Sequence, residues 1–180
     1  MNRISVFDNI VPWHDMHHAF EYSAGSKFIL GWADKMAIEN EKYIENIHST
    51  WVAGELNESR LMPYFNQCIE KTSWFPKVEP QKIIMNLVMT DDVHYLHSHQ
   101  NQSVLLYYVN LEWQDGWHGE TLFCDPNNLD EVVFTSLYKP GRILLFDGKI
   151  PHSIRPQSRK GPKYRMTLSL FFDDRTNGLS

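Results

Sequence analysis

The sequence has few cysteines, no long apolar run and no excess of positive charge. Its two cysteines, Cys68 and Cys124, are too few for a disulfide scaffold or a cysteine-rich zinc module. No run of about 18 apolar residues occurs, and the N-terminal residues lack the apolar segment of a secretory signal. Lysine and arginine number 17 against 22 acidic residues, a net charge of −5, which does not suit a surface that coats nucleic acid. We therefore expect a cytoplasmic protein without a membrane span.

The length and the pattern of apolar residues predict one domain over residues 1–180. Before Pro80 the apolar residues recur at helical spacing, so residues 1–80 are expected to form a helix-rich support. Residues 81–173 hold short β-rich runs separated by turn residues, and residues 174–180 form a tail. Short strands without helix-length gaps between them predict a mainly β fold, an antiparallel sandwich or barrel. The expected strands cover residues 83–89, 104–111, 121–124, 132–138, 142–146 and 165–172.

The last expected strand alternates between polar and apolar residues. Arg165, Thr167 and Ser169 share one face, and four apolar residues share the other. The apolar face suits packing against the N-terminal helices. In a closed double sheet the polar face would then point inward, where a buried arginine is costly without a partner such as an anion. Alternation alone also permits a half-exposed strand with a solvated polar face.

Histidines are concentrated in the β-rich part of the sequence. His97 and His99 are two residues apart, so their side chains point to the same side of an extended segment. His152, far away in sequence, could complete a metal site with them. Imidazole nitrogen suits iron, copper, zinc and nickel, and three ligands leave positions open for other molecules. Because surface histidines are common, the His-x-His pattern by itself leaves a metal site and an ordinary surface both possible.

An ordered series of motifs spans residues 83–172. Its six elements are His97-Ser98-His99, Tyr107-Tyr108-Val109-Asn110 with Trp113, Trp117 to Phe123, Pro140 to Phe146, His152, and Arg165-Met166-Thr167. The series resembles the 2-oxoglutarate and Fe(II)-dependent oxygenases, and within them the prolyl-4-hydroxylase-like branch. The resemblance implies a double-stranded β-helix, which is a cupin-like jelly roll, with N-terminal helices beside it.

The resemblance also implies an activity and its cofactors. The expected enzyme binds Fe(II), 2-oxoglutarate as co-substrate and O2. It hydroxylates a small molecule or a protein side chain and releases succinate and CO2. The matching motifs imply that His97 and His152 are iron ligands. They also imply that Arg165 binds the C5 carboxylate of 2-oxoglutarate through two parallel hydrogen bonds. Tyr108, Thr167 and Ser169 are expected to donate hydroxyl groups to the same co-substrate.

The sequence departs from the family at His99, which replaces the aspartate of His-x-Asp. One hypothesis makes His99 the third metal ligand, so that His97, His99 and His152 hold the iron. In another, His99 turns away and a halide or water takes its position, as in iron halogenases, although histidine is bulky for that arrangement. A carboxylate could also come from elsewhere, with Asp91 and Asp92 the nearest upstream.

Two further hypotheses follow from the missing carboxylate. The chain could be a non-catalytic jelly-roll module that only binds metal, or a three-histidine dioxygenase that needs no 2-oxoglutarate. Among the other histidines, His94 is expected at the rim of the site or in a hydrogen bond to a ligand. His14, His17 and His18 are expected on an ordinary helix surface, although their spacing places them on one helical face.

Overall fold

The computed structural model describes residues 3–32, 47–51, 60–90, 92 and 94–175. Two antiparallel sheets and two helices make up this part of the chain. The strands are β1 (Ile4–Phe7), β2 (Ile29–Trp32), β3 (Ile47–Trp51), β4 (Lys82–Met89), β5 (Gln102–Tyr108), β6 (Thr121–Asp125), β7 (Asn128–Ser136), β8 (Ile143–Asp147), β9 (His152–Ile154) and β10 (Tyr164–Asp173). The helices are α1 (Trp13–Gly25) and α3 (Met62–Glu70).

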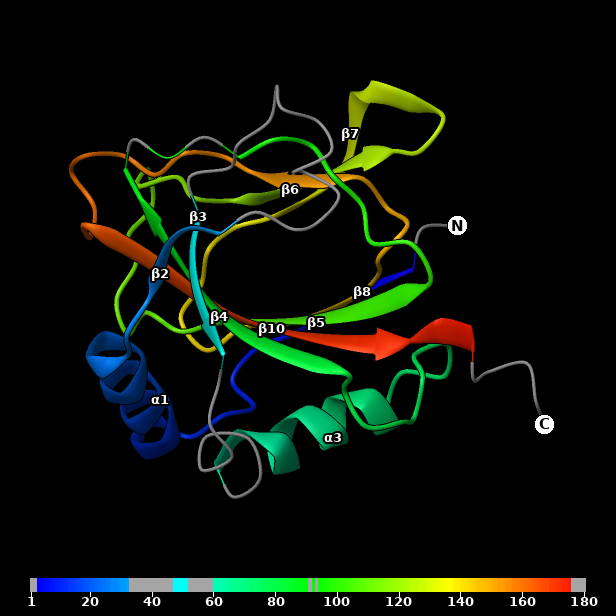
Figure 1. Ribbon diagram of the computed structural model, residues 1–180, viewed down its shortest axis with the longest axis horizontal. Coiled ribbons are helices and arrows are strands. Elements are labelled where there is room, and N and C mark those ends of the chain that lie inside the picture. The colour runs from blue at the N-terminus through cyan, green and yellow to red at the C-terminus, as the bar shows by residue number, and fades with distance from the viewer. Residues whose placement is uncertain (1–2, 33–46, 52–59, 91, 93, 176–180) are drawn as a thin grey trace.

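The elements form three layers. The larger sheet has the strand order β1-β8-β5-β10-β4-β3-β2, and the smaller sheet has the order β7-β6-β9. Both helices lie against one side of the larger sheet, and the smaller sheet lies over its other side (Figure 1). The expected mainly β fold with helices beside it is confirmed.

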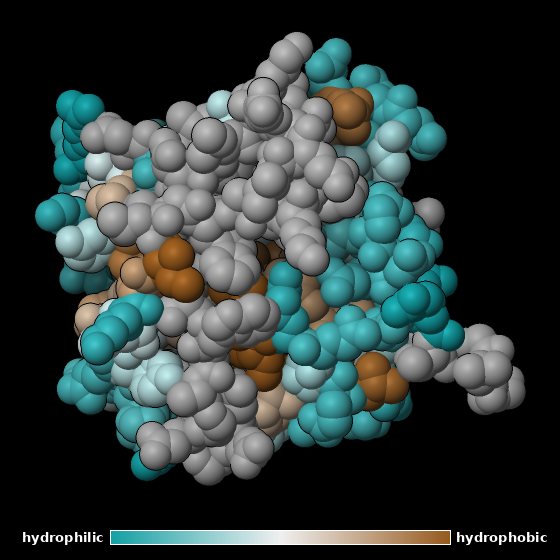
Figure 2. Space-filling model, in the orientation of Figure 1, coloured by the Kyte–Doolittle hydropathy of each residue, from teal (hydrophilic) through white to brown (hydrophobic). Residues whose placement is uncertain are grey.

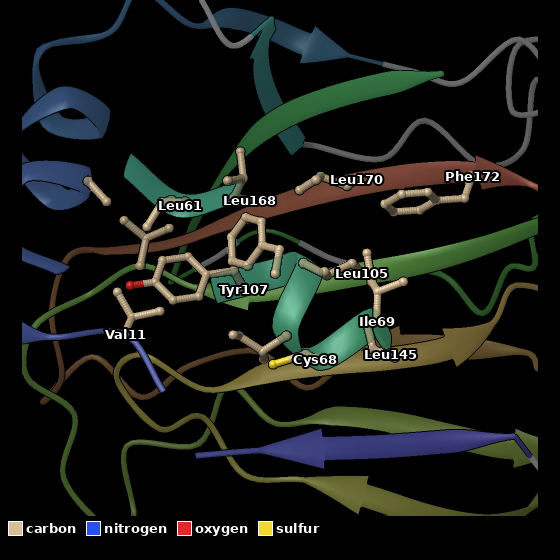
Figure 3. Packing of buried hydrophobic residues seen from close by; sticks show 14 of the residues in the cluster. Val11, Leu61, Cys68, Ile69, Leu105, Tyr107, Leu145, Leu168, Leu170 and Phe172 are labelled. Carbon is tan, nitrogen blue, oxygen red and sulfur yellow. The ribbon is translucent and has the colours of Figure 1, made fainter. Parts of the chain in front are cut away.

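Strand β10 runs through the middle of the larger sheet, between β4 and β5. Its apolar face, formed by Met166, Leu168, Leu170 and Phe172, packs into a core with the two helices, as the alternation predicts. Figure 3 shows Leu168, Leu170 and Phe172 beside residues of α3 and β5, among them Cys68, Ile69 and Tyr107. The opposite face of β10 therefore points toward the smaller sheet.

A second core fills the space between the two sheets. Its buried apolar members come from both sheets and their connections: Ile84, Val104, Leu106, Tyr108, Phe123, Tyr138, Leu144, Phe146, Ile150 and Phe171. Three polar residues of β10 share this inner layer, and Arg165, Thr167 and Ser169 are at most 5% exposed. The inward-facing alternative for the last strand is therefore correct, and the half-exposed alternative is wrong.

The first eighty residues contain more than helices. They also supply β1, β2 and β3 to the larger sheet, where β1 pairs with β8 at the register Ile4 to Phe146 and β3 pairs with β4. These strands have only four or five residues each. Such short segments show no clear alternation in the sequence, and they form because neighbouring strands offer them hydrogen-bond partners.

The six expected strands all occur, with shifted ends. The largest shift is at β7, which begins at Asn128, four residues before the expected start. The turn before it is tight because the Asn127 N–H donates a hydrogen bond to Asp125 Oδ1 at 2.7 Å. Among the described residues no helix is long and apolar enough to cross a membrane. On the face shown in Figure 2, apolar side chains form separate groups between hydrophilic ones.

Candidate metal centre

The fold brings His97, His99 and His152 together. One nitrogen of each ring lies within 4.8 Å of the others, and this is the only such group of histidine, cysteine and acidic side chains in the described residues. Two backbone hydrogen bonds hold His97 beside His152: the His97 N–H donates to His152 O at 3.0 Å, and the His152 N–H donates to His97 O at 2.9 Å. The expected cluster of three histidines is therefore present.

Backbone carbonyls orient two of the three rings. Nδ1 of His97 lies 3.0 Å from Tyr95 O, and Nδ1 of His152 lies 2.9 Å from Ile150 O. Since a carbonyl oxygen only accepts hydrogen bonds, Nδ1 must carry the proton in both rings. The Nε2 atoms then keep their lone pairs, which is the form in which imidazole binds a metal.

His99 lies inside the cluster. Its backbone N–H donates to Gly148 O at 2.6 Å, and its ring meets the edge of Phe171 at a centroid distance of 5.0 Å. This close approach requires glycine at position 148, because a Cβ there would collide with Gln102 O and lie 2.7 Å from His99 O. His99 therefore occupies the position from which a third ligand would reach a shared ion.

Burial keeps two of the rings neutral. It is the largest cause of the lowered pKa of His99, about 3, and the charges of His97 and Lys82 act in the same direction. Burial also lowers the pKa of His152 well below its usual value, assisted by the neighbouring rings. Neutral imidazoles can bind a divalent cation without first losing a proton.

No acidic side chain in the described part of the chain joins this cluster. The carboxylate of Asp92 is engaged in a turn, where its Oδ2 accepts a hydrogen bond from the Met89 N–H at 2.6 Å. The other upstream candidate, Asp91, lies outside the described residues. In the described residues the donor set is therefore three imidazoles.

Arg165 is 0% exposed and projects from β10 into the layer between the sheets. Its Nε donates to Gly119 O at 2.9 Å and its Nη2 donates to Thr121 Oγ1 at 3.2 Å. Its guanidinium carbon lies 5.4 Å from the ring centre of Tyr108 and 5.1 Å from that of Tyr138. Nη1 is buried and has no hydrogen-bond partner among the described residues. A buried cation with an unused donor fits an anionic ligand such as a carboxylate.

The three expected hydroxyl donors lie in the same layer, but they are not equally available. Tyr108 Oη shares a 2.8 Å hydrogen bond with Thr121 Oγ1, the oxygen that Arg165 also contacts. Thr167 is opposite Tyr108 in the sheet register and is buried. Ser169 Oγ accepts a hydrogen bond from Asn86 Nδ2 at 3.0 Å. Tyr108 is therefore directly connected to the surroundings of Arg165, and the co-substrate contacts of Thr167 and Ser169 stay predictions.

Three residues near Arg165 have no role assigned to them in the sequence analysis. Thr121 bridges Tyr108 and Arg165, and Tyr138 covers the guanidinium. Asn110 fixes the start of β10, because its Oδ1 accepts from the Met166 N–H at 2.8 Å and its Nδ2 donates to Tyr164 O at 2.9 Å. The signal for Thr121 was its place at the start of a strand, where alternation puts it and Phe123 on one inward face.

Comparisons with known proteins identify the fold. No family model matches the sequence, and no curated protein matches it. Among solved structures, a prolyl hydroxylase from Trichoplax adhaerens in complex with a peptide fragment has a TM-score of 0.68 at 17% identity, covering 98% of this chain and 86% of that one. The chain has the fold of these oxygenases.

Two further solved structures have the same architecture. A prolyl-4-hydroxylase from Pseudomonas putida has a TM-score of 0.63 at 14% identity, covering 96% of this chain and 93% of that one. HygX from Streptomyces hygroscopicus, with nickel and 2-oxoglutarate bound, has a TM-score of 0.63 at 7% identity, covering 96% of this chain and 83% of that one. The double-stranded β-helix expected from the motifs is confirmed, together with the likeness to 2-oxoglutarate oxygenases.

Proposed function

We propose that the chain is an Fe(II)- and 2-oxoglutarate-dependent dioxygenase that hydroxylates a peptide or a small molecule. One observation carries the proposal: the double-stranded β-helix holds three converging histidines together with a fully buried arginine that has an unused donor. The first feature suits a metal ion and the second suits a carboxylate. A molecule with a metal-binding end and a distant carboxylate would satisfy both.

His97, His99 and His152 would hold the iron, and Arg165 would hold the C5 carboxylate of 2-oxoglutarate. With O2 as the oxidant, the bound iron and 2-oxoglutarate would supply the oxidising chemistry: one oxygen atom would go to the substrate and the other to succinate, with release of CO2. The protein's part is to hold the ligands in a fixed arrangement. Backbone carbonyls fix the His97 and His152 rings, and Gly119 and Thr121 fix the guanidinium, so little reorganisation is needed on binding.

Two aromatic rings and a hydroxyl define the arginine's surroundings. Tyr108 and Tyr138 are stacked with ring centres 4.4 Å apart, and both lie beside the guanidinium. They favour the cation through their ring faces while excluding water. Thr121 Oγ1 accepts from Arg165 and shares a hydrogen bond with Tyr108 Oη, in which either hydroxyl can be the donor. When Thr121 is the donor, the phenol proton of Tyr108 can turn to an incoming carboxylate. This arrangement supplies hydrogen bonds that 2-oxoglutarate can accept.

A centre with three neutral ligands differs electrostatically from one that contains an aspartate. Imidazoles leave the full charge of a divalent ion uncompensated, whereas a carboxylate cancels one unit. We therefore expect a higher iron potential than in a site with two histidines and one carboxylate. The position of His99 inside the cluster favours a hydroxylase over a halogenase, which would need that ring to swing out.

One similar structure holds a peptide fragment and another holds hygromycin B. A peptide and a small polar molecule are therefore both compatible with this fold, and hydroxylation of either is the proposed reaction.

Anaerobic spectroscopy tests the proposal directly. Addition of Fe(II) and 2-oxoglutarate to the protein should give a weak visible charge-transfer band, and admission of oxygen should give succinate. Arg165→Gln should lose the band at 2-oxoglutarate concentrations that saturate the wild type, whereas the exposed-helix variant His17→Phe should keep it. A wild-type protein with neither band nor succinate would overturn the proposal.

The three-histidine donor set favours a second candidate, a dioxygenase that needs no 2-oxoglutarate. In that case Arg165 would bind no co-substrate, and Arg165→Ala should leave oxygen consumption with the true substrate intact. Loss of the succinate-forming reaction in the same variant would favour the first candidate.

A further inference from the structure

Unpaired polar atoms gather around Arg165. Buried side-chain atoms without a hydrogen-bond partner among the described residues are His94 Nδ1 and Nε2, Tyr107 Oη, Glu120 Oε2, Gln157 Oε1 and Arg165 Nη1. Glu120 follows Gly119, whose carbonyl accepts from Arg165, and Gln157 bonds the carbonyl of Val88, the strand partner of Arg165. The charge of Arg165 also acts on the His94 ring. Native proteins leave few such atoms, so a concentration of them marks a place where a ligand makes the missing bonds.

The His94 ring interacts electrostatically with both parts of the candidate site. Burial lowers the pKa of His94 to about 3, and the positive charge of Arg165 and, to a smaller extent, that of His97 act in the same direction. His152 is in turn influenced by His94. The ring is therefore within electrostatic reach of both the arginine and the histidine cluster, and the arginine has the stronger influence.

The other unpaired groups near Arg165 do not complete His94. Gln157 donates through Nε2 to Val88 O at 3.0 Å, and Val88 is the strand partner of Arg165. Glu120 Oε1 lies 3.8 Å from Arg155 Nη1 and 3.7 Å from His118 Nδ1. Each of these side chains is thus held from another direction, and neither makes a hydrogen bond to the His94 ring.

A single carboxylate would satisfy the two unpaired donors. A neutral imidazole carries one N–H, and Arg165 Nη1 carries another that is unused. A carboxylate has two oxygens and about four lone-pair sites, so it can accept from both groups at once. We propose that His94 is a co-substrate-binding residue, which donates its ring N–H to the same 2-oxoglutarate carboxylate that Arg165 binds. This inference rests on the proposed function. It adds a residue to which the family motifs assign no contact with 2-oxoglutarate.

Equilibrium binding to the nickel-loaded protein tests this role without turnover. Calorimetry would measure the Kd of 2-oxoglutarate for the wild type, for His94→Phe, which keeps a flat ring, and for His94→Asn, which keeps an N–H donor. We expect a loss of about tenfold or more in His94→Phe and of less than about threefold in His94→Asn. The exposed control His17→Phe should bind as the wild type does.

Pyruvate separates the two ends of the co-substrate, because it keeps the keto acid and lacks the C5 carboxylate. Its affinity should be the same in the wild type and in His94→Phe if His94 acts beside Arg165. A 2-oxoglutarate Kd within about twofold of the wild type in His94→Phe, or equal losses in the Phe and Asn variants, would refute a donor role. Absence of 2-oxoglutarate binding to the wild type would instead overturn the proposed function, and this inference with it.

Discussion

His97 and His152 are joined by a reciprocal pair of backbone hydrogen bonds, 3.0 and 2.9 Å long, although they are far apart in sequence. The pair fixes the relative position of the two residues through their backbones. The apolar cores on the two sides of the larger sheet contain none of the three histidines. We therefore expect the fold not to depend on a bound metal.

Metal removal should leave the protein folded. We expect the same far-ultraviolet circular dichroism spectrum before and after treatment with a chelator, since strand pairing already fixes His97 and His152. Added Fe(II) under anaerobic conditions, or Zn(II), should raise the Tm by mass action, by an amount that grows with metal concentration. His152→Ala should remove this rise, and the exposed control His17→Ala should retain it. Unfolding on chelation would contradict this expectation.

Substitution of His99 tests whether its ring is a ligand. If it is, His99→Asp should still bind metal, because a carboxylate replaces the lost imidazole and cancels one unit of the metal charge. His99→Ala should bind more weakly, by about tenfold or more. Competition with a chromogenic chelator would measure both affinities. Equal metal affinity in the wild type and in His99→Ala would show that His99 is not a ligand, and loss of binding in His99→Asp would show a different local geometry.

Much of the fold could be predicted from the sequence because its signals are local. The alternation over residues 165–172 identifies both faces of β10, and the turn residues mark the ends of β6 and β7. Strands β1 to β3 could not be predicted in the same way. A strand of four or five residues carries little periodicity of its own, and its pairing in the folded sheet decides that it forms.

The same distinction applies to the candidate site. His97, His99, His152 and Arg165 were recognised because ordered motifs carry them. Thr121 was not recognised, because its role depends on two contacts, with Tyr108 Oη and Arg165 Nη2, that exist only after the sheets have packed. Hydrogen bonds between distant strands leave no pattern in a single sequence.

Thr121 should matter for co-substrate affinity more than for stability. Thr121→Val keeps the shape of the side chain but removes the oxygen that links Tyr108 to Arg165. We expect the KM for 2-oxoglutarate to rise by about tenfold, with a smaller change in kcat, because a buried donor of Arg165 loses its acceptor. Thr135→Val, on the exposed strand β7, is the matched control and should change neither constant. A wild-type KM in Thr121→Val would refute the role of this oxygen.

Asp8 should make the free energy of unfolding depend on pH. Arg142 donates to its carboxylate from Nε at 2.8 Å and from Nη2 at 2.9 Å, and Lys139 donates from Nζ at 3.0 Å. The hydrogen bond from Arg142 is the main cause of a pKa of about 2 for Asp8, lowered from 3.8. The pKa is lower in the folded state, so the stabilisation is complete above the unfolded value and is lost as the pH falls from about 4 to about 2.

Asp8→Asn would remove this stabilisation at neutral pH. Because the pair is partly exposed and screened by solvent, we expect a loss of roughly 1 kcal/mol in the free energy of unfolding at pH 7. Urea unfolding at pH 7 and at pH 3 would measure the difference between variant and wild type, which should shrink at the lower pH. Asp115→Asn, at an exposed aspartate, is the control and should behave as the wild type at both values. The effect of a charge disappears when the carboxylate is protonated, whereas an effect of packing does not depend on pH. A difference that stays constant between pH 7 and pH 3 would therefore mean that the substitution disturbs packing and that the charge of Asp8 contributes nothing.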